Sequence, residues 1–307
     1  MICSQQKKIL IIKFGGLGDI ILSLEAMFAI FKHHSRKLVL LTEKPFDDFL
    51  RESEWFEKII TIERSLFYFN DIISLKKKTL GMDFDYVYDL QTSNRTSNYL
   101  KNFKHKETIT NGIGKYAKIS HSNLNRDEMH TIERQRDQLA LSNVYYKSKP
   151  NLNWLFNSDF LVPKKDYVMV VPGGSKKRKN KRIPTRIYCK ILDFLINVKL
   201  EVLIIGSKDD SLICNEIKNK VPGVKNLCCK TNLFDIAKLS KNSIFSIGND
   251  TGPMHLISKG GRETLVFFTK FSKPELCQPV GKKVSVLIYD GDDKNFYQNV
   301  ISKMKLI

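Results

Sequence analysis

The sequence predicts an α/β fold made of two Rossmann-like parallel-sheet domains that face a central cleft. Short apolar runs typical of buried strands alternate with helix-like segments along the 307 residues, and this alternation favours parallel strands joined by crossover helices. The alternation stops near Pro150 and then starts again. In each half, glycine-rich turns follow strands, and sheets of this kind bind ligands at the carboxyl ends of their strands.

Residues 1–150 are expected to form the first domain. Apolar runs mark its strands, and apolar residues at helical spacing mark its helices. The expected strands are Ile9–Ile12, Leu38–Leu41, Lys58–Ile62 and Tyr86–Leu90, and the expected helices are Asp19–His33, Asn94–Phe103 and Glu128–Val144. The stretch Tyr145–Phe160 breaks the pattern with Pro150 and several asparagines, so we interpret it as the linker.

Residues 151–307 are expected to form the second domain, where the pattern restarts. The expected strands are Tyr167–Val171, Val202–Ile205, Ile244–Ile247 and Thr264–Phe268, and the expected helices are Ile187–Val198, Asn232–Leu239 and Asn295–Lys305. Asn232 is a favourable N-cap residue for the second of these helices. The last helix, residues 295–305, is a candidate for packing back against the first domain.

The chain is strongly basic, with 51 Lys and Arg against 32 Asp and Glu and a formal net charge of +19. Such an excess predicts attraction to nucleic acid, an acidic membrane surface or phosphorylated substrates, although a lysine-rich compositional bias accounts for it equally well. The basic run lacks interleaved aromatic residues, and no nucleic-acid-binding motif occurs in the sequence. We therefore expect no nucleic-acid partner.

Several patterns point to a cytoplasmic protein. The run Ile9–Ile12 is too short for a signal peptide, and no apolar run reaches the roughly 18 residues of a membrane-spanning helix. The six cysteines form no C-x-x-C pair, which favours reduced thiols. The scattered histidines show no zinc spacing, so we expect no metal site.

The run Gly248–Leu256, GNDTGPMHL, carries the most informative pattern. It follows the apolar stretch Ile244–Ile247, and its Pro253 is favoured at the first position of a helix. A strand, a turn and a helix N-terminus in this order aim backbone N–H groups at one point, which suits a phosphate or pyrophosphate. Asp250 and Thr251 add a carboxylate and a hydroxyl. An ordinary capped turn uses the same residue types.

The turn Lys13–Asp19 follows the first strand. A dinucleotide fingerprint is excluded because Ile21 stands where Gly or Ala is needed, although Glu43 could act as the ribose-binding acid of a nucleotide oxidoreductase. Asp19 is placed at a helix N-terminus, where the dipole favours negative charge. A carboxylate there can act as a general base toward a sugar hydroxyl. Judged alone, Asp19 fits a simple N-cap better.

The turn Pro172–Ser175 follows the strand Tyr167–Val171 and leads into the basic run Lys176–Arg182. Small residues let a ligand approach the backbone, and cations neutralise phosphate. A charge run is also typical of a solvated loop. Because this turn ends a strand, as Gly248–Leu256 does, we favour a phosphate site with Lys181 as its cation.

Two acidic segments are interpreted as surface turns. Asp83–Asp85 has the D-x-D form that some glycosyltransferases use for a divalent metal, but it precedes a strand instead of following one. Asp290–Asp293 lacks the length and the closing glutamate of a calcium loop.

Taken together, these segments resemble the heptosyltransferase family of bacterial glycosyltransferases, glycosyltransferase family 9, which has the GT-B fold. The matching segments run in order along nearly the whole chain: Ile9–Leu24, Asp89–Gln91 with Asn94 and Arg95, Pro172–Pro184, Leu203–Asp209, Gly248–Leu256 and Phe267–Gly281. Gly248–Leu256 is the most specific of them. Ile183 departs from the family pattern, because a tryptophan usually follows the basic pair.

The resemblance implies an inverting, metal-independent transfer of a sugar, typically heptose from ADP-heptose, to the growing inner core of lipopolysaccharide. It assigns catalysis to Asp19, as general base, and to Lys181. It assigns donor binding to Gly173, Gly174, Ser175, Lys181, Arg182, Gly206, Asp250, Thr251, Gly252 and His255, and acceptor binding to Gly15, Gly16, Gln91 and Arg95. No cofactor or metal is implied, and the expected partners are a nucleotide diphosphate sugar, an anionic glycolipid acceptor and the inner-membrane surface.

Other functions stay open at this point. The chain could use a different nucleotide sugar and a different glycan acceptor, or it could be a nucleotide-sugar epimerase, since that chemistry also uses two Rossmann-like halves. A catalytically silent partner subunit is disfavoured because Asp19 and Asp250 are both present.

Overall fold

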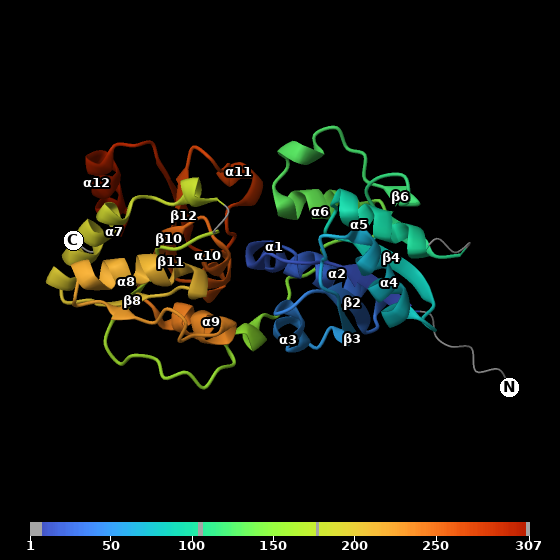
Figure 1. The fold of residues 1–307 in the computed structure, drawn as a ribbon, viewed down its shortest axis with the longest axis horizontal. Helices are drawn as coiled ribbons and strands as arrows, with labels where there is room; N and C mark the ends of the chain where they lie inside the picture. Colours follow the sequence, from blue (N-terminus) through green and yellow to red (C-terminus); the bar gives the residue numbers. More distant parts are fainter. Residues whose placement is uncertain (1–7, 104–106, 176–177, 305–307) are drawn as a thin grey trace. The chain divides into compact units, whose positions relative to one another are not determined.

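The computed structural model describes residues 8–103, 107–175 and 178–304. The chain divides into two compact units, Met1–Leu152 and Asn153–Ile307, and each unit is a parallel β-sheet with helices around it (Figure 1). In the described part of the chain, every helix is too short or too polar to cross a membrane. The cysteines described there carry thiols, not disulfides.

The first domain is built on a six-stranded parallel sheet with the order β3-β2-β1-β4-β5-β6. Its strands are β1 (Lys8–Ile12), β2 (Leu38–Thr42), β3 (Phe56–Thr61), β4 (Phe84–Asp89), β5 (Ile109–Gly112) and β6 (Ile119–Ser120). Its helices are α1 (Leu17–Leu22), α2 (Leu24–His34), α3 (Phe46–Arg51), α4 (Tyr68–Thr79), α5 (Asn94–Tyr99) and α6 (Thr131–Ala140), with short 3₁₀ turns η1 (Leu100–Phe103) and η2 (Arg126–Glu128).

The second domain repeats this plan with the strand order β12-β11-β10-β7-β8-β9. Its strands are β7 (Tyr167–Val171), β8 (Glu201–Ile204), β9 (Lys225–Asn226), β10 (Phe245–Asn249), β11 (Glu263–Thr269) and β12 (Val284–Tyr289). Its helices are α7 (Thr185–Asn197), α8 (Ser211–Lys220), α9 (Leu233–Asn242), α10 (Gly252–Ile257), α11 (Pro274–Cys277) and α12 (Asp293–Met304), with 3₁₀ turns η3 (Asn153–Phe156), η4 (Lys179–Lys181), η5 (Lys208–Asp210) and η6 (Ser258–Gly260).

In both sheets, the order in which successive strands are added reverses next to the first strand. Numbered within each domain, the strands run 3-2-1-4-5-6, the order of dinucleotide-binding folds, which bind ligands where the order reverses. That point lies between β1 and β4 in the first domain and between β7 and β10 in the second. Ile12 pairs with Asp89 at one of these edges, and Val171 pairs with Gly248 at the other. The two Rossmann-like parallel sheets predicted from sequence are therefore confirmed.

The predicted helix Asp19–His33 is wrong in one respect, because it breaks at Ser23 into α1 and α2. The Ser23 hydroxyl donates to the backbone oxygen of Asp19 at 2.6 Å, a back-bonding pattern that bends or interrupts helices. The predicted helix Glu128–Val144 is also too long, since α6 covers only Thr131–Ala140. As predicted, Asn232 caps α9 by accepting from the backbone N–H of Asp235 at 3.0 Å.

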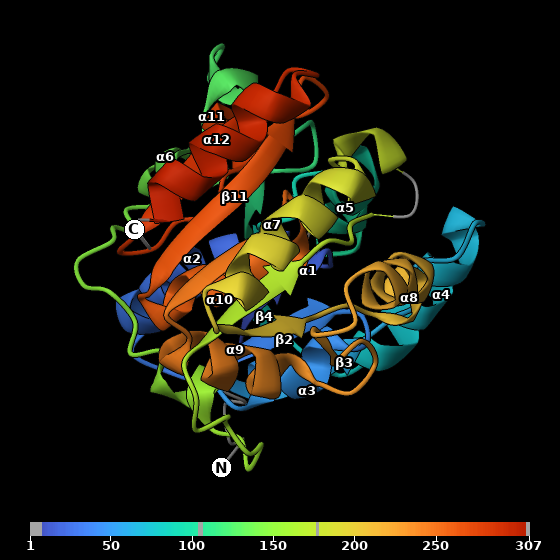
Figure 2. The same ribbon diagram turned by 90° about the vertical axis from the view of Figure 1, so that its left-hand side faces the viewer.

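The last helix packs within the second domain. On α12, Phe296, Val300 and Met304 belong to the buried cluster that also contains Val168 and Ile187, and α12 lies beside α7 (Figure 2). The sequence left packing against the first domain open as an alternative, whereas these apolar positions are buried on the second domain's own sheet. The predicted end of this helix, Lys305, lies outside the described residues.

Candidate active site

In the first domain, Asp19 lies at a cavity of about 200 Å³ at the carboxyl ends of β1 and β4. Asp19 occupies the third position of α1, and its carboxylate accepts from the backbone N–H of Gly16 at 3.3 Å. Its side chain is exposed, so a substrate can reach the carboxylate. The cavity is lined by Lys13, Asp19, Leu90, Gln91, Thr92, Thr131, Arg134, Gln135 and Gln138.

A short relay of hydrogen bonds fixes the backbone of Asp19. The amide of Gln135 on α6 donates to the Ser23 hydroxyl at 2.7 Å, and that hydroxyl donates to the Asp19 backbone oxygen. Ser23 is fully buried, so water does not compete for these bonds. Helix α6 therefore holds the first turn of α1 in place against the sheet.

The walls of the cavity carry positive charge. Lys13 follows β1 and is only 4% exposed, and burial lowers the pKa of its ammonium, while the negative charges of Asp19 and Asp89 oppose that change. Burial also raises the pKa of Asp89 to about 6. The hydrogen bonds that its carboxylate accepts from the backbone N–H groups of Thr92 and Gln91 act in the opposite direction and lower this pKa. With the guanidinium of Arg134 on α6, this side of the cavity suits an anionic group.

Of the residues predicted to bind the acceptor, Gln91 lies at the cavity. Its side-chain oxygen accepts from the backbone N–H of Phe14 at 3.1 Å. Gly16 is exposed, and a Cβ atom built there would meet no other atom within 4 Å. Gly15 is buried, and a Cβ atom there would lie 2.4 Å from the ring of Phe46. Its N–H donates to Glu43 at 2.9 Å, so Gly15 allows close packing of the turn.

Arg95 has a different environment from Gln91. Its Nε donates to the carboxylate of Asp71 at 2.6 Å, and its Nη2 donates to the backbone oxygen of Ser65. Asp71 is fully buried on α4 and also accepts from the hydroxyl of Tyr99. Arg95 thus connects α5 to α4 and does not line the Asp19 cavity.

In the second domain, the predicted donor turns lie together at the carboxyl ends of β7, β8 and β10, which are neighbours in the sheet. Asn249, at the end of β10, joins two of these turns. Its amide donates to the backbone oxygens of Pro172 at 2.7 Å and Gly173 at 3.1 Å, and its oxygen accepts from the N–H of Ile183 at 3.1 Å. Ile183 is buried in the core, at the position where the family usually has tryptophan.

Asp210 joins the turns after β7 and β8. Its carboxylate accepts from the N–H of Gly174 at 3.0 Å and from the N–H of Ser207 at 3.0 Å. A Cβ atom on Gly173 would lie 2.1 Å from this carboxylate, and one on Gly206 would lie 3.0 Å from the Cβ of Asp210. Both glycines are therefore required for the two turns to approach each other.

Lys181 and Asp250 form an ion pair with a separation of 2.6 Å between Nζ and Oδ2. Their side chains are 14% and 6% exposed, so the pair is largely removed from water. Arg182 donates to the backbone oxygen of Gly174 and lies 3.6 Å from Asp210. The structure thus brings the predicted cations of the basic loop onto the predicted glycine-rich turns.

The remaining predicted donor residues are three residues of the first turns of α10 and Ser175, which ends the turn after β7. Thr251 is the N-cap residue of α10, and Gly252 is its first residue. His255 is 5% exposed on the buried side of this helix. Ser175 is exposed, and its backbone oxygen accepts from the N–H of Arg178 at 3.1 Å. Lys176 and Lys177 of the predicted basic run lie outside the described residues.

The two acidic segments, Asp83–Asp85 and Asp290–Asp293, have structural roles. Asp85 lies within β4 and pairs with Arg36 at 2.7 Å, so Asp83–Asp85 is the start of a strand and only in part a turn. Asp292 caps the first turn of α12, and Asp293 pairs with Arg186. Within residues 8–103, 107–175 and 178–304, no cluster of three or more His, Cys, Asp and Glu side chains could hold a metal ion.

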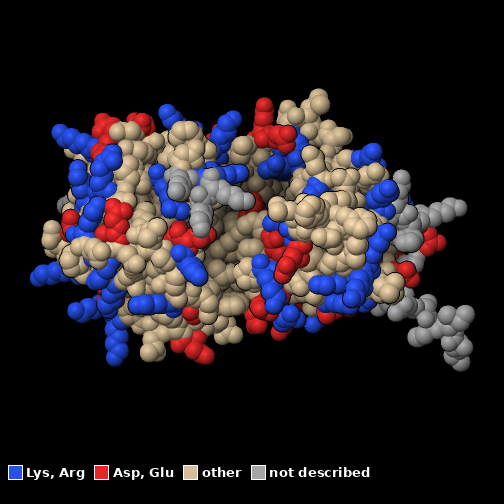
Figure 3. Space-filling model, in the orientation of Figure 1, with Lys and Arg blue, Asp and Glu red and all other residues tan. Residues whose placement is uncertain are grey.

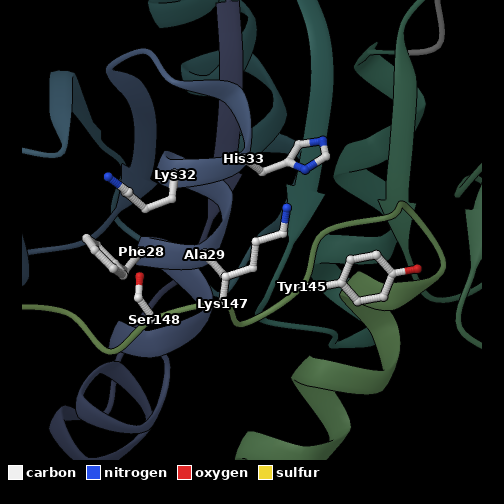
Figure 4. Close-up of a pocket in the computed structure, with 7 residues that line it drawn as sticks. All are labelled: Phe28, Ala29, Lys32, His33, Tyr145, Lys147 and Ser148. Atoms are coloured by element: carbon white, nitrogen blue, oxygen red, sulfur yellow. The ribbon is translucent and has the colours of Figure 1, made fainter.

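A second hollow of about 200 Å³ lies between the end of α2 and the segment that follows α6, as Figure 4 shows. Lys32, His33 and Lys147 line it together with Phe28 and Tyr145. It contains none of the predicted site residues, and α2 ends at the opposite edge of the sheet from Asp19, because crossover helices run antiparallel to their strands.

Lys13, Arg134, Gln135, Asn249 and Asp210 were not assigned to the site from sequence. Lys13 carried a usable signal, because a charged residue directly follows the apolar run Ile9–Ile12. Asn249 also carried one, because it stands inside the predicted turn Gly248–Leu256 next to Asp250. Arg134, Gln135 and Asp210 reach the site from segments that no local pattern marks. Asp210, for example, is 36 residues from its partner Gly174.

Two Rossmann-like parallel sheets, one with an exposed carboxylate beside a polar cavity and the other with glycine-rich turns and partly buried cations, are the arrangement expected of a GT-B glycosyltransferase. The chain belongs to glycosyltransferase family 9 (heptosyltransferase), since the family model matches residues 72–303. It is therefore a glycosyltransferase.

Two curated relatives are named lipooligosaccharide heptosyltransferase 2. The one from Campylobacter jejuni is 26% identical over 276 residues, which are 87% of this chain and 83% of that enzyme. The one from Haemophilus influenzae is 29% identical over 112 residues, which are 35% of this chain and only 32% of that enzyme. The fold is also similar to that of the E. coli heptosyltransferase WaaC with ADP, with a TM-score of 0.76 and 17% sequence identity. The superposition covers 96% of this chain and 99% of the WaaC chain.

Proposed function

We propose that this protein is an inverting, metal-independent heptosyltransferase that transfers heptose from ADP-heptose to a lipopolysaccharide core or a related surface-glycan acceptor. The observation that carries the proposal is the exposed Asp19 carboxylate at the edge of a polar cavity, in a chain of glycosyltransferase family 9. The donor assignment is supported by the heptosyltransferase relatives and by the ADP in the similar E. coli structure.

The first domain would bind the acceptor. Lys13 and Arg134 give the Asp19 cavity positive charge, so an acceptor that carries phosphate or carboxylate groups is favoured. Gln91, which lines this cavity, and the exposed Gly16 would contact the acceptor's hydroxyl groups. Arg95 would act indirectly, through the segment that Asp71 anchors.

In the reaction, the acceptor hydroxyl gives its proton to Asp19 while its oxygen attacks the anomeric carbon of the donor sugar. The bond from that carbon to the diphosphate breaks, its electron pair leaves with the diphosphate, and attack from the opposite side inverts the anomeric configuration. Lys181, Arg182 and the backbone N–H groups around Thr251 and Gly252 would stabilise the departing negative charge.

A thermal-shift series tests the donor. ADP, UDP, GDP, CDP and NAD are compared, each at a concentration far above its expected dissociation constant, and we expect a selective shift with ADP. A ligand at 100 times its dissociation constant stabilises the folded state by about 2.7 kcal/mol, which a melting curve resolves. A shift with UDP alone would mean that the donor is a UDP-sugar instead of ADP-heptose. A shift with NAD alone would overturn the assignment to sugar transfer.

Transfer is expected to continue in excess EDTA at the rate measured without it. The diphosphate charge would be neutralised by Lys181 and Arg182, which lie on the donor turns. The rate of ADP release is measured with EDTA, with added Mg²⁺ and with added Mn²⁺. Strict dependence on either ion would contradict the proposal and direct attention to other carboxylates such as Asp83.

A further inference from the structure

The segment Leu66–Leu80 carries an unusual concentration of exposed apolar side chains. Of the 15 large hydrophobic side chains that are exposed in the described part of the chain, six lie here, so the segment stands apart from the rest of the surface. Leu66 is 99% exposed, Phe67 72%, Phe69 71%, Ile73 51% and Leu80 84%, and Tyr68 is 39% exposed. A contiguous exposed apolar patch of this kind marks an interaction surface.

Helix α4 presents part of this patch on one face, and Leu66, Phe67 and Leu80 adjoin its two ends. Phe69, Ile73, Lys76 and Leu80 follow one another at spacings of three or four residues, so they lie along a single stripe. The opposite stripe contains Asp71 and Leu75, which are fully buried. The helix is therefore fixed to the domain by one face and exposes an apolar face to solvent.

The exposed apolar side chains are held in position by the buried groups beneath them. Asp71 accepts from the N–H of Ser65 at 2.9 Å and from Arg95, which also binds the Ser65 backbone oxygen. The ring of Tyr68 stacks on that of Tyr99 with the centroids 5.8 Å apart. The start of the patch is therefore held in a defined conformation, because Asp71, Arg95 and Tyr99 fix its backbone and the Tyr68 ring to the domain.

Positive charge adjoins the apolar stripe. Lys76, Lys77 and Lys78 are all exposed at the end of α4. Elsewhere, on the face shown in Figure 3, Lys and Arg are scattered over both domains with Asp and Glu between them, so overall charge does not single out a surface. An apolar helix face flanked by lysines is the combination that binds an anionic lipid interface.

The start of the patch lies at the same edge of the sheet as the Asp19 cavity. Leu66–Phe69 follow β3 at its carboxyl end, and Asp19 follows β1 at its carboxyl end, whereas the end of α4 lies at the opposite edge. Arg64, just before the patch, pairs with Glu43, and Glu43 accepts from the N–H of Gly15 in the turn that leads to Asp19. A surface that contacts Leu66–Phe69 therefore lies on the same side of the domain as the proposed acceptor cavity.

We propose that Leu66–Leu80 docks the first domain on an anionic lipid bilayer, with Leu66, Phe67, Phe69 and Ile73 inserted among the headgroups and Lys76 and Lys77 on the lipid phosphates. This orientation presents the Asp19 cavity to an acceptor that is itself anchored in the membrane. The orientation rests on the proposed function, whereas docking itself needs neither donor nor acceptor.

Sedimentation with vesicles tests the docking. The full chain is mixed with vesicles of phosphatidylethanolamine and phosphatidylglycerol, or with neutral phosphatidylcholine vesicles, without any sugar substrate. We expect binding to the anionic vesicles and a drop of at least about tenfold in the partition coefficient for Phe67→Ser with Phe69→Ser, because each phenylalanine loses its apolar contact. Lys76→Gln with Lys77→Gln should weaken binding by roughly fivefold per charge.

Matched controls separate the patch from general stickiness and charge. Leu161→Ser with Leu212→Ser removes two side chains that are 90% and 88% exposed elsewhere, and Lys164→Gln with Lys165→Gln removes two exposed neighbouring lysines; both should bind as the parent does. All altered side chains are exposed, so melting temperatures should not change.

Docking is overturned if the parent stays in the supernatant, or if Phe67→Ser with Phe69→Ser binds the vesicles as well as the parent. It is also overturned if the control variants lose as much vesicle binding as the patch variants do. A parent that fails to bind vesicles and self-associates through these phenylalanines would assign the patch to protein contact instead. Sugar transfer to a soluble acceptor, measured on the same variants, shows whether the proposed function survives when docking fails.

Discussion

Replacing Asp19 with alanine is expected to lower kcat/KM for sugar transfer by about 10²- to 10⁴-fold, the usual contribution of a general base. The ADP-induced thermal shift should stay as in the parent, because the predicted donor turns lie in the second domain. The Asp19 side chain is exposed, and the hydrogen bond that it accepts comes from Gly16 in its own turn, so the protein should still fold. Initial rates of ADP release with acceptor in excess measure the effect.

Two companion variants make the result specific. Asp19→Asn keeps the shape of the side chain and an oxygen for the Gly16 N–H, but it cannot take a proton, so it should be as inactive as Asp19→Ala. Glu133→Ala removes an exposed carboxylate of α6, close to cavity residue Arg134 and paired with Arg136, and should keep full activity. Near-parental turnover by Asp19→Ala would remove this carboxylate from the mechanism.

The strands were predictable because parallel strands buried on both faces appear as continuous apolar runs. Ile9–Ile12 and Tyr167–Val171 are examples, and their buried side chains agree with this expectation. The edge strand β12 was missed although its sequence, Val-Ser-Val-Leu-Ile-Tyr, is mostly apolar and carried a usable strand signal. The short strand β5 was missed because its sequence, Ile-Thr-Asn-Gly, is mostly polar.

Helix α4 was missed for a physical reason that bears on the proposed docking. Its outward face carries Phe69 and Ile73, while its buried face carries the charged Asp71. This departs from the usual pattern of an apolar buried face and a polar exposed face, because apolar side chains are exposed and a carboxylate is buried beside Leu75. The departure becomes interpretable only when Arg95 and Tyr99, which are distant in sequence, are seen to satisfy Asp71.

The site could be predicted to the extent that its parts are local. The turns after β7 and β10 are continuous in sequence, so residues such as Gly173 and Asp250 were found from their place at strand ends. Their support was not visible, because Asn249 and Asp210 act on turns that are distant along the chain. The pairing of Lys181 with Asp250 across 69 residues was equally hidden, although each residue had been assigned to the donor site.

That pair leads to the second large effect. Replacing Lys181 with methionine should weaken ADP binding by between about tenfold and 150-fold, the range for losing a hydrogen bond to a charged group. Folding stability should fall as well, by about 3–5 kcal/mol, because Asp250 keeps its charge in a site that is only 6% exposed. Calorimetric titration with ADP and urea unfolding measure the two effects separately.

The double variant Lys181→Met with Asp250→Asn distinguishes a donor cation from a purely structural one. Neutralising Asp250 removes the buried unpaired charge, so stability should recover toward the parent value, whereas ADP binding should stay weak because the ammonium is still missing. Lys190→Met, an exposed lysine on α7 of the same domain, should change neither quantity. If ADP binds the double variant as tightly as the parent, Lys181 serves only to hold Asp250, and the diphosphate must be bound by Arg182 and the backbone of the turns.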